Sequence, residues 1–142
     1  DSEMSATAEH LKEFTDKRLL GVLSTTNLDG SPQATPIWYL YDGEHFKITS
    51  HGGRVKVRNI RRDPRVTLVV TDTSGYGDHL LVRGTAEIVE QGGEEFTYTM
   101  ARRYMGEDAG RASAEEDIEY AHGIGRPCVV IRITPERLVL VE

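Results

Sequence analysis

Several short stretches of the chain alternate apolar and polar residues, the pattern of β-strands that bury one face. Such stretches occupy residues 19–26, 33–41, 44–50, 66–71, 79–90, 128–134 and 138–141. Short connections that contain glycine, residues 27–30 and 42–43, favour antiparallel hairpins. The first three strands are therefore predicted to form a meander.

Helical spacing interrupts this series of strands in four places. Residues 6–17 and the basic segment that ends at Asp63-Pro64 have helical patterns, and residues 113–122 show a weaker one. A further helix is indicated by Phe96, Met100 and Tyr104, spaced four residues apart. Hairpin-linked strands with inserted helices predict a mainly β fold, an antiparallel barrel with helical additions. We expect a single domain over residues 4–142, with residues 1–3 a cloning remnant before Met4.

Composition narrows the class of protein. With 142 residues, 38% of them hydrophobic, the chain is long enough for one continuous core. A net charge of −6 disfavours a broad nucleic-acid or membrane surface. No run of about 18 apolar residues and no signal peptide is found. The lone cysteine, Cys128, excludes an intrachain disulfide and suggests a reducing compartment, so we expect a cytoplasmic protein.

Positive charge is concentrated in one segment. Six Arg or Lys and one Asp lie between residues 54 and 65 of this acidic chain. Thr49 and Ser50 end the preceding strand, and two glycines then lead into the basic helix. Hydroxyls, backbone N–H groups at a helix start and cationic side chains together favour an anion. The sequence therefore predicts a phosphate site here.

Five segments carry a resemblance to a known family: residues 21–25, 29–33, 36–39, 56–66 and 82–86. They resemble the pyridoxamine 5′-phosphate oxidase-like split β-barrel superfamily, and most of all its F420-dependent flavin/deazaflavin oxidoreductases. The resemblance implies an antiparallel split β-barrel of the FMN-binding type. It also implies a homodimer with cofactor sites at the subunit interface, F420 or alternatively FMN as cofactor, and hydride transfer to or from a small conjugated molecule.

The resemblance also implies a set of cofactor-binding residues. A strand beside the cofactor ring would supply main-chain groups, and the following strand and helix would hold the phosphate. The implied residues are Thr35, Pro36, Ile37 and Trp38 for the ring, and Thr49, Ser50, Arg54 and Lys56 for the phosphate. Val55, Asn59, Arg58 and Arg61 complete the implied cofactor-binding set. Tyr76 and His79 are candidates for the substrate side of the ring, although a loop-tip aromatic and a surface histidine are the commoner outcomes. No catalytic side chain is expected, because the cofactor carries the chemistry.

A helical wheel divides the basic segment into two stripes. Lys56, Asn59 and Ile60 fall on one side, the inner face: we expect Lys56 to bind the phosphate, Asn59 to order the turn and Ile60 to anchor the helix in the core. The other side carries Arg54, Arg58, Arg61 and Arg62. Arg54, at the helix start, is expected to reach the phosphate from the loop. The remaining arginines form either a solvated face or a contact for the oligoglutamate tail that F420 carries and FMN lacks.

Alternatives of other classes stay open. One alternative to an F420-dependent oxidoreductase is an FMN-dependent oxidoreductase. The other is a non-catalytic protein that binds flavin, haem or F420. Oxidation of vitamin B6 is disfavoured, since the chain stops at Glu142 without the Trp- and Arg/His-containing extension of the true oxidases. The histidines lack metal-ligand spacing, so no metal is expected. Quinones, conjugated carbonyl compounds and linear tetrapyrroles all remain compatible substrates.

Overall fold

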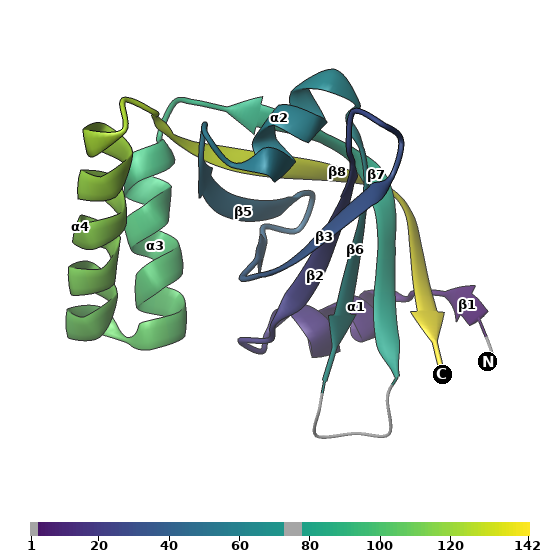
Figure 1. Cartoon of the computed structure of the whole chain (residues 1–142). Coiled ribbons are helices and arrows are strands. Elements are labelled where there is room, and N and C mark those ends of the chain that lie inside the picture. Colours follow the sequence, from purple (N-terminus) through teal and green to yellow (C-terminus); the bar gives the residue numbers. More distant parts are fainter. Residues whose placement is uncertain (1–2, 73–77) are drawn as a thin grey trace.

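One antiparallel sheet organises the molecule in the computed structural model, which describes residues 3–72 and 78–142 (Figure 1). The strands are β1 (Glu3–Ser5), β2 (Gly21–Thr26), β3 (Pro32–Ile37), β4 (Leu40–Tyr41), β5 (Phe46–His51), β6 (Arg65–Thr71), β7 (His79–Val89) and β8 (Cys128–Val141). The helices are α1 (Ala8–Thr15), α2 (Val55–Arg62), α3 (Gly93–Met105) and α4 (Glu107–Gly123).

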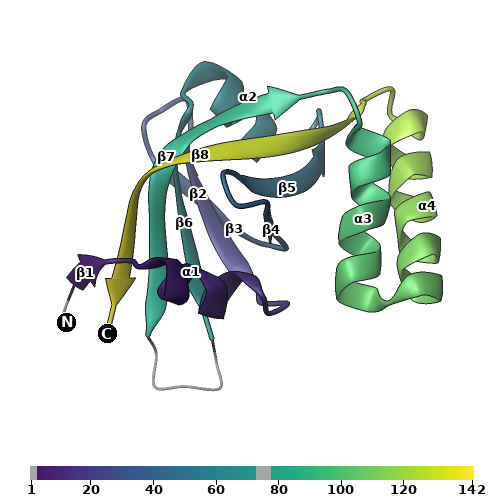
Figure 2. The same ribbon diagram turned by 180° about the vertical axis from the view of Figure 1, so that it is seen from behind.

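The strands follow the order β3-β2-β6-β7-β8-β5-β4, with β1 added beside β8, and all pairs are antiparallel. The long strands β7 and β8 curve through the whole molecule and connect its two halves (Figures 1 and 2). The two runs expected at 128–134 and 138–141 are one strand, which passes Pro135 at an irregularity of the β7–β8 ladder. This arrangement confirms the mainly β, antiparallel split-barrel fold.

The predicted three-stranded meander is wrong in one respect. The β2–β3 and β4–β5 hairpins form as expected, but the stretch 33–41 is interrupted at Trp38 and Tyr39, so β3 and β4 lie at opposite ends of the strand order. Tyr39 is fully buried, and its hydroxyl donates to the carbonyl of Phe14. Its backbone N–H donates to the Tyr104 hydroxyl at 3.2 Å instead of to a neighbouring strand. Tertiary contacts thus end the ladder here.

The core fills the concave side of the sheet. Alternate residues of β2, β5, β6 and β7 point inward, among them Leu23, Ile48, Leu68 and Val82, all nearly inaccessible to solvent. The helix α1 adds Phe14 from one end of the barrel. Burial of these aliphatic and aromatic side chains is the main stabilising contribution, at roughly 1.5 to 3 kcal/mol for each fully buried one.

The helices α3 and α4 form an antiparallel pair beside the barrel, at the β5 end of the sheet (Figures 1 and 2). Two glycines permit its close packing. A Cβ on Gly110 would lie 2.6 Å from the Arg102 backbone, and one on Gly93 would lie 2.0 Å from the carbonyl oxygen of Cys128. The start of α3 is therefore held directly against the start of β8.

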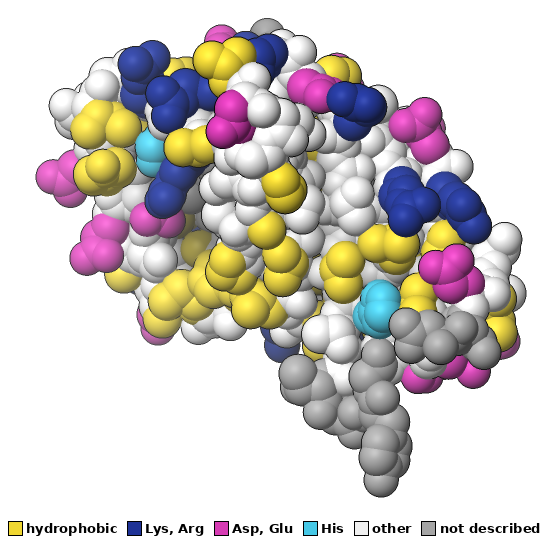
Figure 3. Space-filling model, turned by 45° about the vertical axis from the view of Figure 1, so that its right-hand side comes forward, with side chains coloured by type: hydrophobic (Ala, Val, Ile, Leu, Met, Phe, Trp, Pro, Cys, Tyr) yellow, Lys and Arg dark blue, Asp and Glu magenta, His cyan; other side chains and the backbone are white. Residues whose placement is uncertain are grey.

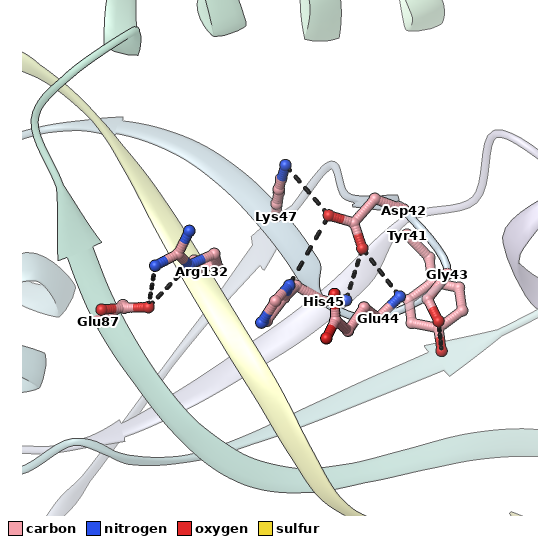
Figure 4. A network of polar contacts seen from close by, with 8 residues as sticks. All are labelled: Tyr41, Asp42, Gly43, Glu44, His45, Lys47, Glu87 and Arg132. Atoms are coloured by element: carbon pink, nitrogen blue, oxygen red, sulfur yellow. Dashed lines mark hydrogen bonds and ion pairs between the residues drawn. The ribbon is translucent and has the colours of Figure 1, made fainter.

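A polar network fixes the turn between β4 and β5 (Figure 4). The Asp42 carboxylate accepts hydrogen bonds from the backbone N–H groups of Glu44 at 2.9 Å and His45 at 2.6 Å, and lies 3.1 Å from the Lys47 ammonium. Burial by itself would raise the pKa of Asp42, but these three partners lower the pKa to about 2.

This network predicts a pH-dependent contribution to stability. The Asp42→Asn variant should be about 1 kcal/mol less stable than the unmodified protein above pH ~5, because the charge-assisted bonds are lost. The folded-state pKa of about 2 lies below the ordinary value of 3.8 that the carboxyl has in the unfolded chain. The carboxylate's contribution is therefore complete above the unfolded pKa and is lost as the pH falls through the folded pKa.

Urea unfolding of both proteins from neutral pH to pH ~2 measures this difference, which should shrink between pH ~4 and ~2. Glu44→Gln is the control, because it removes an exposed carboxylate from the same turn. A difference that stays constant over the whole range would contradict the assignment.

Candidate functional site

A cavity of about 390 Å³ lies among the ends of β3 and β5, the start of α2, and the helices α3 and α4. This volume is in the range of small-molecule and cofactor sites. Six of the residues named from the sequence line it: Thr35, Pro36, Thr49, Ser50, Arg54 and Lys56. The fold thus brings together residues from two strands and a helix start.

Cations dominate the α2 side of the cavity. Arg54 is the N-cap residue of α2, and no side chain caps this helix start. Over the described ranges, no carboxylate comes within 4.0 Å of the cationic groups of Arg54 or Lys56. Burial, and then the charge of Arg54, lowers the pKa of Lys56. A helix start and two cations without a carboxylate partner form a site suited to an anion.

The hydroxyls at the end of β5 differ in their availability. The Thr97 hydroxyl donates to the carbonyl of Gly93 at 2.8 Å, so in its 2.9 Å contact with Thr49 it accepts, and the single Thr49 proton is used. The Ser50 hydroxyl has only a long contact, 3.4 Å, with the carbonyl of His51. Ser50 is therefore the better placed of the two to donate to an anion.

The opposite wall is the edge strand β3. The Thr35 hydroxyl oxygen is buried and has no hydrogen-bond partner in the part of the chain that the structure describes. Pro36 has no N–H group, which suits an edge position. Among the strands that the structure describes, β3 pairs only with β2, so its other side has backbone groups that none of these strands satisfies. These groups fit a ligand that has a ring with a polar edge, such as a flavin or deazaflavin.

Five further residues line the cavity that the sequence did not point to: His51, Thr97, Asp117, Tyr120 and Cys128. Asp117 and Tyr120 are three residues apart and so share one face of α4. That spacing was visible in the sequence, but the packing of α4 decides where the face lies. The weak apolar periodicity of this acidic helix gave no such indication.

His51 is an uncharged part of this wall near neutral pH. Its Nδ1 accepts a hydrogen bond from the backbone N–H of Gly53 at 3.1 Å, and its ring lies 5.7 Å from that of Tyr120. Burial and the charges of Arg54 and Lys56 lower the pKa of His51. Burial likewise raises the pKa of the Cys128 thiol.

Several of the predicted site residues do not line this cavity. Ile37 is buried in the core, and Trp38 stacks on Tyr104 with ring centroids 4.7 Å apart. Val55 is 40% exposed. His79 lies opposite Val141 in the β7–β8 ladder. Tyr76 lies outside the described residues.

The Asn59 side chain is hydrogen-bonded to other parts of the fold and has a structural role. Its amide nitrogen donates to the Thr25 hydroxyl at 3.0 Å and to the Asn27 side-chain oxygen at 2.9 Å. Asn59 is almost fully buried and does not line the cavity. It joins α2 to the β2–β3 turn and so orients the helix start that presents Arg54 and Lys56.

The three outer arginines of α2 are exposed but not equivalent. Arg61 pairs with Glu90 at 3.1 Å. Arg62 donates to the Thr26 carbonyl at 2.9 Å and to the Asn59 side-chain oxygen at 2.8 Å. No carboxylate among the described residues pairs with Arg58. Arg58 is thus the member of this stripe best able to meet an additional anionic group.

Residues 3–72 and 78–142 contain no group of three or more His, Cys, Asp or Glu arranged to hold a metal ion. None of the helices in these ranges is long and apolar enough to cross a membrane.

Comparison with solved structures supports the fold. An F420 reductase has 29% sequence identity and a TM-score of 0.71, with 89% of this chain and 94% of that chain covered. A conserved hypothetical protein from Mycobacterium tuberculosis has 27% identity and a TM-score of 0.72, with 94% and 82% covered. A FAD-binding protein from Mesorhizobium loti shares the fold at 22% identity and a TM-score of 0.61, with 99% and 98% covered.

The family described as pyridoxamine 5′-phosphate oxidase matches residues 7–142, nearly the whole chain. This match agrees with the split-barrel topology and with the resemblance found in the sequence. The chain belongs to the pyridoxamine 5′-phosphate oxidase family.

Proposed function

We propose that the protein is an F420-dependent oxidoreductase that transfers a hydride between the deazaflavin cofactor and a small conjugated organic substrate. Family membership supports the broader class, an oxidoreductase with a flavin-type cofactor. The observation that carries the proposal is the pair of cations without carboxylate partners, Arg54 and Lys56, in one cavity with the polar edge of β3. The similarity to an F420 reductase favours F420 over FMN.

Each wall has a separate role in this proposal. Arg54, Lys56 and Ser50 bind the phosphate, and the edge of β3 with the Thr35 hydroxyl binds the polar side of the ring. When bound, F420 supplies the hydride chemistry, so the protein contributes position, charge and exclusion of water. Arg58 is the arginine of the outer stripe that we assign to the tail carboxylates.

We further propose that a second copy of the chain covers the outer face of the sheet. Four apolar residues lie in register there, across β3, β2, β6 and β7: Pro36, Val22, Val69 and Leu81. Val22 is 41% exposed, and Figure 3 shows hydrophobic side chains gathered in a band on this side of the molecule. Because Pro36 also lines the cavity, a partner on this face would help to close the site.

Cofactor choice tests the central proposal. F420 should bind more tightly than FMN in titrations followed by absorbance or fluorescence, and reduced F420 should be oxidised in steady state when a quinone or conjugated carbonyl compound is added. Tighter binding of FMN would favour the FMN-dependent alternative. Binding of F420 without turnover of any acceptor class would favour a carrier or sensor.

The phosphate site can be tested with a matched pair of variants on α2. Lys56→Ala should weaken binding of both F420 and FMN about ten- to a hundredfold, the value of a hydrogen bond to a charged group. Arg58→Ala removes the same unit charge outside the cavity. It should leave FMN binding unchanged and, because we assign Arg58 to the tail, should weaken F420 binding by less than about fivefold. Far-UV circular dichroism checks that both variants fold. Equal effects of the two substitutions would place the phosphate elsewhere.

The proposed dimer predicts that a substitution in its interface lowers the mass of the protein in solution. The unmodified protein should sediment as a dimer at micromolar concentration, and Val22→Glu should shift it to a monomer because a charge is buried in the apolar interface. Leu28→Glu is the control, since Leu28 is an 81% exposed aliphatic residue in the β2–β3 turn. A monomeric unmodified protein with cofactor bound would contradict the dimer.

A further inference from the structure

The cofactor cavity carries charges of both signs. Asp117 of α4 lines it together with Arg54 and Lys56 of the α2 segment. In the described ranges, the Asp117 carboxylate has no Lys, Arg or His nitrogen within 4.0 Å, so no direct ion pair neutralises it. His51 and Cys128 face the same space as uncharged groups near neutral pH, since their pKa values are lowered and raised respectively. Two cations and one carboxylate therefore set the charge of the cavity.

Asp117 is electrostatically coupled to the cationic wall. Burial raises the pKa of its carboxyl, the charge of Arg54 opposes that rise, and the neighbouring Glu116 adds to it. Asp117 and Arg54 line the same cavity, so the carboxylate acts on any anion that Arg54 holds there. Asp117 and Glu116 are both exposed, but only Asp117 lines the cavity.

We propose that Asp117 is a specificity-determining residue that favours a singly charged phosphodiester over a doubly charged phosphomonoester in this cavity. The proposal rests on the proposed function, because the phosphate of F420 is a diester, whereas that of FMN is a monoester. In this proposal the choice of cofactor depends on Asp117 of α4 as well as on the phosphate-binding segment at the start of α2.

The physical reason is a balance between attraction and desolvation. Two cations and one carboxylate leave the cavity with one net positive charge, and a ligand with a single negative charge balances it. The second charge of a phosphomonoester, whose second pKa is about 6, is attracted by Arg54 and Lys56 but repelled by Asp117. Desolvation costs rise more steeply with charge than attraction does, so the unbalanced second charge lowers affinity.

The experiment compares two flavins that share one ring system. FMN carries a phosphomonoester, and riboflavin 4′,5′-cyclic phosphate carries a phosphodiester. Dissociation constants of both are measured by fluorescence at pH 8 for the unmodified protein, Asp117→Asn, Asp117→Glu and Glu116→Gln. Glu116→Gln is the matched control, one residue away on the same helix.

Asp117→Asn should tighten FMN binding more than binding of the cyclic phosphate and shift the ratio of the two constants about two- to fivefold toward FMN. Asp117→Glu should keep the original ratio, and Glu116→Gln should change it by less than about twofold. Equal changes for both flavins would overturn the proposal. Weaker binding of both would also overturn it, since it would mean that Asp117 only orients Arg54.

If Glu116→Gln shifted the ratio of the two dissociation constants as much as Asp117→Asn does, the effect would come from the overall charge of α4. That result would contradict a specific role for Asp117. Failure of both flavins to bind Asp117→Asn at millimolar concentration would also overturn the proposal. F420 is not used in this comparison. Failure of the proposed function, seen as absence of F420 binding or turnover, is therefore distinguishable from failure of the role assigned to Asp117.

Discussion

Burial of Tyr39 is the constraint on which the rest of the structure depends. Its side chain enters the core, its hydroxyl bonds to the end of α1, and its backbone N–H bonds to Tyr104 of α3. These contacts remove residues 38–39 from the sheet and separate β3 from β4 in the strand order. They leave β3 as an edge strand, and Thr35 and Pro36 of this strand line the cavity.

The same junction positions α3. The Tyr104 hydroxyl donates to the Leu19 carbonyl at 2.7 Å, and its ring stacks on Trp38. At the other end of α3, Gly93 packs against Cys128 so closely that a side chain there would collide with the β8 backbone. Because both ends are fixed, α3 is held firmly and sets the position of α4, which contributes Asp117 and Tyr120 to the cavity.

The cavity concentrates polar groups that the fold itself does not satisfy. Among the described residues, the Thr35 hydroxyl lacks a partner and Lys56 is half-buried without a carboxylate beside it. Buried groups of this kind cost stability, and in native proteins they are usually satisfied by a ligand or by water. By contrast, Asn59 and Arg62 on the same helix are hydrogen-bonded to the end of β2 and to the β2–β3 turn. The ligand-directed cations Arg54 and Lys56 thus lie at the start of α2, and the structural polar groups Asn59 and Arg62 lie in its last turn.

The sequence by itself determined the strands, the hairpin turns, the basic helix and the family, because these follow from local periodicity, turn residues and a contiguous pattern of side chains. It also placed Lys56 and the outer arginines on different faces of α2, since helical spacing fixes that. It missed the break at Tyr39 and the α4 wall of the cavity. Both depend on contacts between residues more than 60 positions apart, Tyr39 with Tyr104 and His51 with Tyr120. Only the tertiary structure decides such contacts, because local patterns are the same whichever partner a buried side chain finds.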